Sequence, residues 1–241
     1  MGEFNGKSGH GLYTWEMTLD LSSNDGLRIG DFDPISKAML KFIAVLVGVL
    51  ISGGAAVAKP PTLLALGDSL TAGYGLAVNE AFPVKLEAAL RASHPDLRIL
   101  NGGVSGDTAA DGLARLDWAL TDDVTGLILE LGANDALRGL GAAQTEAALD
   151  AILAKAQEKK LPVLILGMRA PPNLGADYAR AFGGLYPRLA QKYQALLYPF
   201  YLDGVAADPL LNQDDGIHPN AKGVDIIVSK IAPKVEELLT K

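Results

Sequence analysis

From residue 59 onward, short apolar runs alternate with longer stretches in which hydrophobic residues recur every three or four positions. The apolar runs predict strands at residues 63–66, 97–100, 127–131, 162–166 and, more weakly, 196–202. The periodic stretches between them predict helices over residues 83–93, 143–159 and 178–197. Near-continuous apolar strands separated by amphipathic helices are typical of a parallel sheet with helices on both faces. We therefore predict an α/β fold of three layers, α/β/α, around a central, mainly five-stranded parallel sheet.

The C-terminal stretch predicts one further helix. It is expected to begin at Pro219, because proline is favoured in the first turn, where its missing N–H leaves no helical bond unmade. Its inward face is predicted to consist of Val224, Ile227, Val228 and Ile231. Pro233 is expected to kink or break this helix, because a proline inside a helix removes a backbone donor.

Residues 39–58 carry the pattern of an export signal. A lysine follows Met39 closely, residues 42–51 are uncharged, and Ala56-Val57-Ala58 forms a small-residue cleavage site. The uncharged stretch is shorter than the ~20 residues of a spanning helix, which favours a cleaved signal over a membrane anchor or a core helix. We therefore predict a periplasmic or secreted protein whose globular domain comprises residues 59–241. Residues 1–38 show no clear period, and we interpret them as an extension upstream of a start at Met39, which the mass of the exported protein would test.

Composition narrows the possible functions. The 241 residues carry a formal net charge of −7, whereas nucleic-acid binding needs clustered Lys and Arg. The chain has no cysteine, which excludes disulfides, thiolate metal ligands and a cysteine nucleophile. After residue 58 the only histidines are His94 and His218, so we predict no metal site and no cofactor. A hydrophobic content of 49% suits one globular domain with a substantial core.

The candidate chemistry is nucleophilic acyl transfer. Ser69 directly follows the first predicted strand, and Asp215 stands three residues before His218, a spacing at which one turn can aim both at the same point. A serine hydroxyl becomes a nucleophile when a histidine takes its proton, and the histidine needs a third group to hold its tautomer. Segments following strands of a parallel sheet share one edge, where ligands bind in such folds. These residues are therefore expected to meet there.

Each of these residues has a rival in the sequence. Ser105 also lies in a glycine-flanked loop, and Asp214 is the neighbour of Asp215. His94 stands before a proline at the expected end of a helix, where a solvated role is typical. The Gly-x-Ser-x-Gly motif of α/β-hydrolases is not present. The residues alone favour Ser69 and His218 and leave the choice of carboxylate open.

Four segments, in order along the chain, resemble the sequence blocks of the SGNH (GDSL) hydrolase family. They are Gly67-Asp68-Ser69-Leu70, Gly103-Val104-Ser105-Gly106-Asp107, Gly132-Ala133-Asn134-Asp135 and Asp215-Gly216-Ile217-His218. The resemblance spans residues 62–238 and is similar in detail to the thioesterase I, lysophospholipase and arylesterase subgroup. One departure is Ala133, where that subgroup commonly has a second glycine, and its methyl group could slightly reshape the neighbouring loop.

The resemblance implies the flavodoxin-like SGNH fold and a role for each motif residue. Ser69 would be the nucleophile, His218 the base and Asp215 the carboxylate that orients it. The resemblance assigns the oxyanion hole to the backbone N–H groups of Ser69 and Gly106 and to the side-chain amide of Asn134. Asp68 is expected to brace loops by hydrogen bonds rather than to take part in the chemistry.

The implied function is hydrolysis of aryl and short-to-medium acyl esters, with acyl thioesters and lysophospholipids as further substrates. Residues predicted to line an apolar acyl groove are Leu137, Leu140, Pro171 and Pro172. A second interpretation is an acetyl esterase acting on glycans, and a third is a catalytically silent binding domain. The expected partner is a small ester or thioester substrate, with membrane contact only through the export signal or a lipid substrate. The sequence does not indicate an oligomeric state.

Overall fold

The computed structural model describes residues 59–241. The predicted export signal and the extension before it, residues 1–58, lie outside the described residues. Within residues 59–241, five parallel strands form one sheet in the order β2-β1-β3-β4-β5. The strands are β1 (Thr62–Gly67), β2 (Arg98–Gly103), β3 (Gly126–Glu130), β4 (Val163–Leu166) and β5 (Leu196–Tyr198). The predicted parallel sheet of five strands is therefore confirmed.

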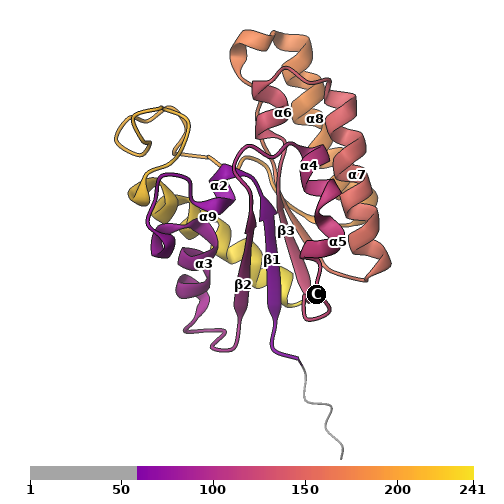
Figure 1. Ribbon diagram of the computed structural model, residues 1–241, viewed down its shortest axis with the longest axis vertical. Coiled ribbons are helices and arrows are strands. Elements are labelled where there is room, and N and C mark those ends of the chain that lie inside the picture. Colours follow the sequence, from indigo (N-terminus) through magenta and orange to yellow (C-terminus); the bar gives the residue numbers. More distant parts are fainter. Residues whose placement is uncertain (1–58) are drawn as a thin grey trace, which may run out of the picture. The chain divides into compact units, whose positions relative to one another are not determined.

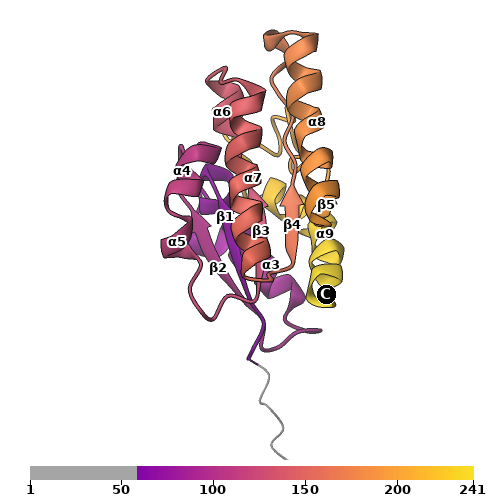
Figure 2. The same cartoon turned by 90° about the vertical axis from the view of Figure 1, so that its right-hand side faces the viewer.

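Helices cover both faces of the sheet (Figure 1 and Figure 2). The helices are α2 (Ser69–Ala72), α3 (Phe82–Leu90), α4 (Ala109–Ala114), α5 (Leu116–Ala119), α6 (Ala133–Leu137), α7 (Ala142–Glu158), α8 (Ala176–Tyr193) and α9 (Ala221–Leu239). Two short 3-10 turns, Val78–Glu80 and Pro172–Leu174, precede α3 and α8. Helices α3 and α9 pack together on one face, and α4, α5, α7 and α8 cover the other (Figure 1). This arrangement confirms the three-layer α/β/α prediction.

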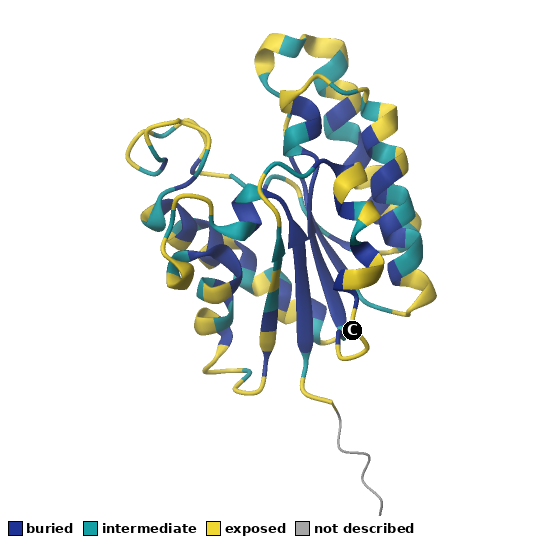
Figure 3. Ribbon diagram, in the orientation of Figure 1, coloured by how far each residue is buried: buried dark blue, intermediate teal, exposed yellow. Residues whose placement is uncertain are grey.

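The core follows from the apolar runs of the sequence. Strands β1, β3 and β4 are buried along their whole length, which matches their near-continuous hydrophobic composition (Figure 3). Helix α7 buries the predicted stripe of Leu149, Ile152, Leu153 and Ala156, and α9 buries all four residues of its predicted inward face. Hydrophobic burial on both faces of the sheet fixes the strand register.

Several element boundaries differ from the sequence prediction: α3 ends at Leu90 rather than residue 93, β5 ends at Tyr198 rather than residue 202, and the bounds of α8 and α9 differ as well. Helix α8 ends at Tyr193, four residues early, because Gln194 adopts a left-handed conformation with φ 53° and turns the chain into β5. Helix α9 begins at Ala221 rather than Pro219, because Asn220 caps it by accepting hydrogen bonds from the first-turn N–H groups. Pro233 does not end α9, which continues to Leu239 with further buried residues.

The parallel arrangement brings four loops to one edge of the sheet. The segments that follow β1, β2 and β3 all begin at the carboxyl ends of adjacent strands. The segment that precedes α9 joins them there, since His218 contacts Ser69. Ligands of open α/β sheets bind beyond this edge.

Candidate active site

Ser69 is the first residue of a short helix that starts directly after β1. The side chain of Asp68 caps this helix, with Oδ1 accepting a hydrogen bond of 3.0 Å from the Leu70 N–H. Asp68 is fully buried, so the turn that carries Ser69 is anchored in the core rather than held by a solvated loop. The strand and the cap together fix where the Ser69 hydroxyl lies.

Ser69, His218 and Asp215 form a continuous hydrogen-bonded chain. His218 Nε2 lies 2.9 Å from Ser69 Oγ, and His218 Nδ1 lies 2.6 Å from Asp215 Oδ2. The other oxygen of Asp215 accepts the backbone N–H groups of Ile217 and His218 at 2.9 and 3.0 Å. The N–H of His218, its side chain and the N–H of Ile217 lower the pKa of Asp215 to about 2, so this carboxylate is ionised at neutral pH.

The rival residues lie away from this chain. Ser105 is exposed in the loop after β2, and among the described residues its hydroxyl has no hydrogen-bond partner. Asp214 is exposed and does not contact His218, whereas Asp215 does. His94 follows α3 and is half-buried, with its backbone N–H bonded to Leu90. The geometry therefore brings together the three residues that the sequence favoured.

One of the three residues predicted to form an oxyanion hole, Asn134, bonds to the capping residue of the Ser69 turn, and the other two would contribute backbone N–H groups. Within residues 59–241, neither the Ser69 N–H nor the Gly106 N–H has a hydrogen-bond acceptor. Gly106 has φ +91°, a conformation that favours glycine over residues with a Cβ. The Asn134 side chain donates to Asp68 Oδ2 at 3.1 Å and to the Asp107 carbonyl at 2.9 Å. Asn134 would therefore have to share or exchange one of these bonds to bind an oxyanion.

Two arginines hold the loop that carries Gly106. Arg115 Nε donates to Asp107 Oδ2 at 2.6 Å, and another of its nitrogens donates to the Gly67 carbonyl at 2.9 Å. Arg138 donates to the Gly106 carbonyl at 2.7 Å. Charge-assisted bonds on both sides of the loop fix the backbone around Gly106 before a substrate arrives.

A second carboxylate, Glu130, is buried directly behind Asp68. Its Oε2 accepts the Thr71 hydroxyl at 2.7 Å and the Asp68 N–H at 3.3 Å, and its Oε1 is buried without a partner among the described residues. Burial and the neighbouring charge of Asp68 raise the pKa of Glu130 well above its ordinary value. Burial also raises the pKa of Asp68, to about 6. The pair therefore carries at most one negative charge near neutral pH.

Replacing Glu130 with glutamine should change how stability depends on pH. Above the ordinary pKa of 4.5, the folded protein holds a proton on Glu130 that the unfolded chain releases. The wild-type free energy of unfolding should thus fall relative to the variant by about 1.4 kcal/mol per pH unit, until the raised pKa is reached. Urea unfolding near pH 5 and pH 7 measures this difference. Exposed Glu158→Gln is the control, and equal slopes for wild type and Glu130→Gln would contradict the buried protonated acid.

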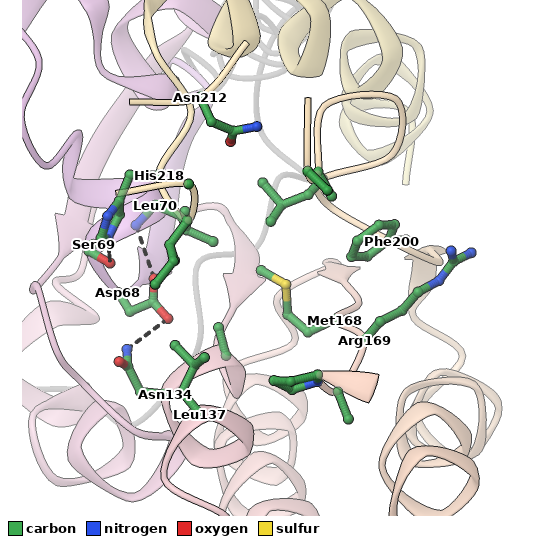
Figure 4. Close-up of a pocket in the computed structure, with 18 of the residues that line it drawn as sticks. Asp68, Ser69, Leu70, Asn134, Leu137, Met168, Arg169, Phe200, Asn212 and His218 are labelled. Atoms are coloured by element: carbon green, nitrogen blue, oxygen red, sulfur yellow. Dashed lines mark hydrogen bonds between the residues drawn. The ribbon is translucent and has the colours of Figure 1, made fainter. Parts of the chain in front are cut away.

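A cavity of about 400 Å³ opens beside Ser69 and His218. In Figure 4, Ser69 and His218 lie on one side of it and Phe200 on the other, with Met168 between them. Its wall includes the apolar side chains of Leu70, Leu137, Met168, Pro171, Pro172, Phe200, Leu202 and Ile217. Three of the four residues predicted to line an acyl groove, Leu137, Pro171 and Pro172, are part of this wall.

The fourth predicted groove residue, Leu140, does not line the cavity. The loop after α6 turns its backbone toward α8 instead, where the Leu140 carbonyl accepts the Tyr178 hydroxyl at 2.7 Å. Sequence proximity to Leu137 suggested a shared role, but Gly139 has φ +66° and redirects the chain between the two leucines.

Comparison with known protein families identifies one that matches most of the described domain. A family model described as the GDSL-like lipase/acylhydrolase family matches residues 65–226, two thirds of the chain. The chain belongs to this family. The sequence-based resemblance to SGNH (GDSL) hydrolases is thereby confirmed for this acylhydrolase, and the flavodoxin-like fold expected of it agrees with the observed sheet.

Individual relatives of this acylhydrolase cover most of its length. Esterase TesA of Pseudomonas aeruginosa is 37% identical over 183 residues, which is 76% of this chain and 91% of the relative. Thioesterase 1/protease 1/lysophospholipase L1 of Escherichia coli is 38% identical over 210 residues, 87% of this chain and 97% of the relative. The crystal structure of AlinE4, an SGNH-hydrolase family esterase, is 49% identical, with a TM-score of 0.64, and covers 76% of this chain and 99% of AlinE4.

Several residues around the site escaped the sequence analysis. Glu130 ends a strand, where a carboxylate is expected to reach solvent, so its burial gave no signal. Tyr74 and Gln213 lie beside the motifs in sequence, and only the folded chain shows that they meet. Phe200 lines the cavity from the segment following β5, whereas Met168 belongs to the stretch after β4 that the sequence had already indicated for the groove. Position after a strand was the one signal that pointed toward Phe200.

Residues 59–241 were compared with the requirements of metal sites and of membrane-spanning helices. That range contains no cluster of three or more His, Asp or Glu side chains with the geometry to hold a metal ion. None of its helices has both the length and the hydropathy that crossing a membrane requires.

Proposed function

We propose that this protein is a serine ester hydrolase with Ser69 as nucleophile, His218 as general base and Asp215 as the orienting carboxylate. The observation that carries the proposal is the unbroken chain from Ser69 Oγ through His218 to Asp215, with links of 2.9 and 2.6 Å. Both distances lie within hydrogen-bond reach, which is the geometric requirement for proton transfer. Membership of an acylhydrolase family supports the same reaction class.

The reaction divides into acylation and deacylation. His218 Nε2 takes the Ser69 proton while Oγ bonds to the acyl carbon, and Asp215 stabilises the imidazolium that forms. The negative charge on the substrate oxygen faces the free N–H groups of Ser69 and Gly106. His218 then protonates the leaving alcohol or thiol as its bond to the acyl carbon breaks. Water, deprotonated by His218, attacks the acyl-enzyme, and as the bond to Ser69 Oγ breaks His218 returns the proton to Oγ, which releases the acid and restores the serine.

The apolar cavity supports acyl chains longer than acetyl as substrates. A wall of leucine, methionine, proline and phenylalanine side chains offers hydrophobic burial but few hydrogen bonds for a sugar. The names of the relatives, esterase, arylesterase and thioesterase 1/lysophospholipase L1, agree with aryl esters, thioesters and lysophospholipids as candidate substrates. Apart from Asp68, Ser69 and His218, the polar side chains of this wall are Asn134, Arg169 and Asn212, so its mainly apolar lining favours an acyl chain over the sugar of an acetylated glycan.

A series of p-nitrophenyl esters from acetyl to palmitoyl tests this proposal. Each methylene buried in the cavity should contribute about 0.8 kcal/mol, so kcat/KM should rise by up to about fourfold per methylene over the shorter chains. Activity should then level off when the chain outgrows the cavity. A maximum at acetyl, with a decline at every longer chain, would contradict the acyl-cavity interpretation and favour the glycan acetyl esterase.

Two leucines supply a matched pair for the same assay. Leu137, the last residue of α6, lines the cavity, and Leu140, three residues later, does not. Leu137→Ser should flatten the chain-length profile, because it replaces apolar wall with a hydroxyl. Leu140→Ser should leave the profile unchanged. An equal effect of both substitutions would show that the assay reports the stability of the loop rather than the cavity.

We also propose that the protein is exported. The support is the basic, apolar and small-residue order of residues 39–58, followed by the domain that contains the site. The match to the Escherichia coli relative covers 210 residues, more than the described domain holds, so it includes part of residues 1–58. Sequencing the N-terminus of protein recovered from the periplasm or medium should give Lys59, and an intact residue 1–58 segment there would contradict a cleaved signal.

A further inference from the structure

The turn that carries His218 belongs to a long connection without helix or strand. It runs from the end of β5 at Tyr198 to the start of α9 at Ala221, and its only regular pairing is an isolated bridge between Asn212 and Pro219. Figure 1 shows this segment in gold, standing out as an open loop on the side of the sheet that α3 and α9 cover. Asp215 and His218 therefore depend on local contacts for their position.

Gln213 forms hydrogen bonds within the turn that carries His218 and also to the segment that follows Ser69. Its backbone N–H donates to the His218 carbonyl at 2.8 Å, which closes the turn around Asp215. Its side-chain amide donates to the Pro219 carbonyl at 3.0 Å and to the Tyr74 carbonyl at 2.8 Å. Tyr74 lies five residues after Ser69, so one amide group joins the turn that carries His218 to the segment that carries Ser69.

Few other contacts join these two segments. Among the described residues, the hydrogen bonds between residues 69–76 and 212–219 are the Gln213 bond to Tyr74 and the bond from His218 to Ser69. The ring of Tyr74 also packs on the imidazole of His218, with centroids 4.6 Å apart and planes tilted by 37°. Direct contact between these two segments thus includes one amide, one ring and the bond from His218 to Ser69 itself.

The backbone near Tyr74 is shaped to admit the Gln213 amide. Gly75 has φ +74°, and a Cβ placed on it would lie 2.0 Å from Gln213 Oε1. A side chain at this position would therefore displace the amide or strain the backbone. The absence of a Cβ at Gly75 lets the Gln213 side chain lie against the segment that follows Ser69.

We propose that Gln213 and Tyr74 are positioning residues that set the distance between His218 and Ser69, a role that rests on the proposed function of this site. Gln213 joins the turn of His218 to the segment that carries Ser69, and the Tyr74 ring packs against the imidazole. Neither residue is part of the cavity wall. The two residues should therefore affect the chemical step and leave binding of the acyl chain unchanged.

Gln213→Glu removes the two hydrogen bonds that the side-chain amide donates, with almost no change in the shape of the side chain. The carboxylate cannot donate a hydrogen bond, and it faces two carbonyl oxygens that the amide had bound. We expect kcat for p-nitrophenyl esters to fall by about 10- to 100-fold with KM within about twofold, since small displacements of reacting groups cost about this much. Gln213→Ala and Gly75→Ala should lower kcat in the same way. Gln191→Glu, on the exposed surface of α8, is the control for the added charge.

A double-mutant cycle with His218→Ala separates positioning from general destabilisation. If Gln213 acts through His218, then Gln213→Glu should have no further effect on the residual activity of His218→Ala. A kcat within twofold of wild type for both Gln213 variants would overturn the proposal. So would an equal loss in the presence and absence of His218, or a loss confined to KM. Retained turnover in Ser69→Ala would instead refute the proposed function, so the two failures are distinguishable.

Discussion

Ser69→Ala is expected to lower kcat/KM for ester hydrolysis by about 10⁴-fold or more without changing the fold. The hydroxyl is the nucleophile of the proposed reaction, and its removal prevents the acyl-enzyme from forming while the backbone N–H of residue 69 remains. The helix cap does not depend on it, because Asp68 supplies the cap and the Leu70 N–H is the donor. Initial rates with p-nitrophenyl butyrate, together with thermal unfolding of the variant, measure both parts of this prediction.

Two other serines control this experiment. Ser229→Ala removes a hydroxyl that bonds to the Ile226 carbonyl on the exposed side of α9, and it should leave activity unchanged. Ser105→Ala tests the rival nucleophile and should retain most of the wild-type rate, because its exposed hydroxyl has no partner among the described residues. Full turnover in Ser69→Ala with loss in Ser105→Ala would reverse the assignment. An inactive wild-type protein would favour a catalytically silent binding domain.

The sequence predicted the layers of this fold because burial leaves a strong pattern. Strands covered on both faces contain almost no polar residue, and long helices such as α7 repeat their apolar positions every three or four residues. Helix ends were harder to predict, since Gln194 stops α8 through a left-handed conformation that glutamine rarely adopts. The prediction that Pro233 would kink or break the last helix used only the local preference of proline. Burial of Val235 and Leu238 beyond it favours continuation of α9.

The candidate site was predictable to the extent that its residues lie in short motifs at strand ends. Ser69, Asn134 and His218 stand in such motifs, and the parallel topology brings them to one edge. Contacts between segments far apart in sequence were not predictable in this way. The amide of Gln213 donates to the carbonyl of a residue 139 positions away in the sequence. The buried carboxylate of Glu130 accepts the backbone N–H of Asp68, which is 62 positions away. No local pattern encodes such pairs.

Asp215→Asn is expected to lower kcat by about 10³- to 10⁴-fold with little change in KM. In the proposed reaction the carboxylate stabilises the imidazolium during proton transfer, and its pKa of about 2 keeps it charged throughout the pH range of ester assays. An asparagine has nearly the same shape, so the cavity and the turn should persist. Steady-state kinetics near pH 8, with circular dichroism to verify folding, provide the measurement.

The orientation of the introduced amide makes this loss specific. In the wild type, one oxygen of Asp215 accepts the backbone N–H groups of Ile217 and His218, and the other accepts from His218 Nδ1. The asparagine oxygen should stay with the two backbone donors, which turns its NH₂ group toward His218 Nδ1. Nδ1 must then accept a hydrogen bond from this NH₂ group, so the ring hydrogen moves to Nε2. A protonated Nε2 cannot accept the proton of the Ser69 hydroxyl. Asp214→Asn makes the same chemical change one residue away and should retain activity within a few-fold, whereas an equal loss in both variants would indicate a general effect of charge on the loop.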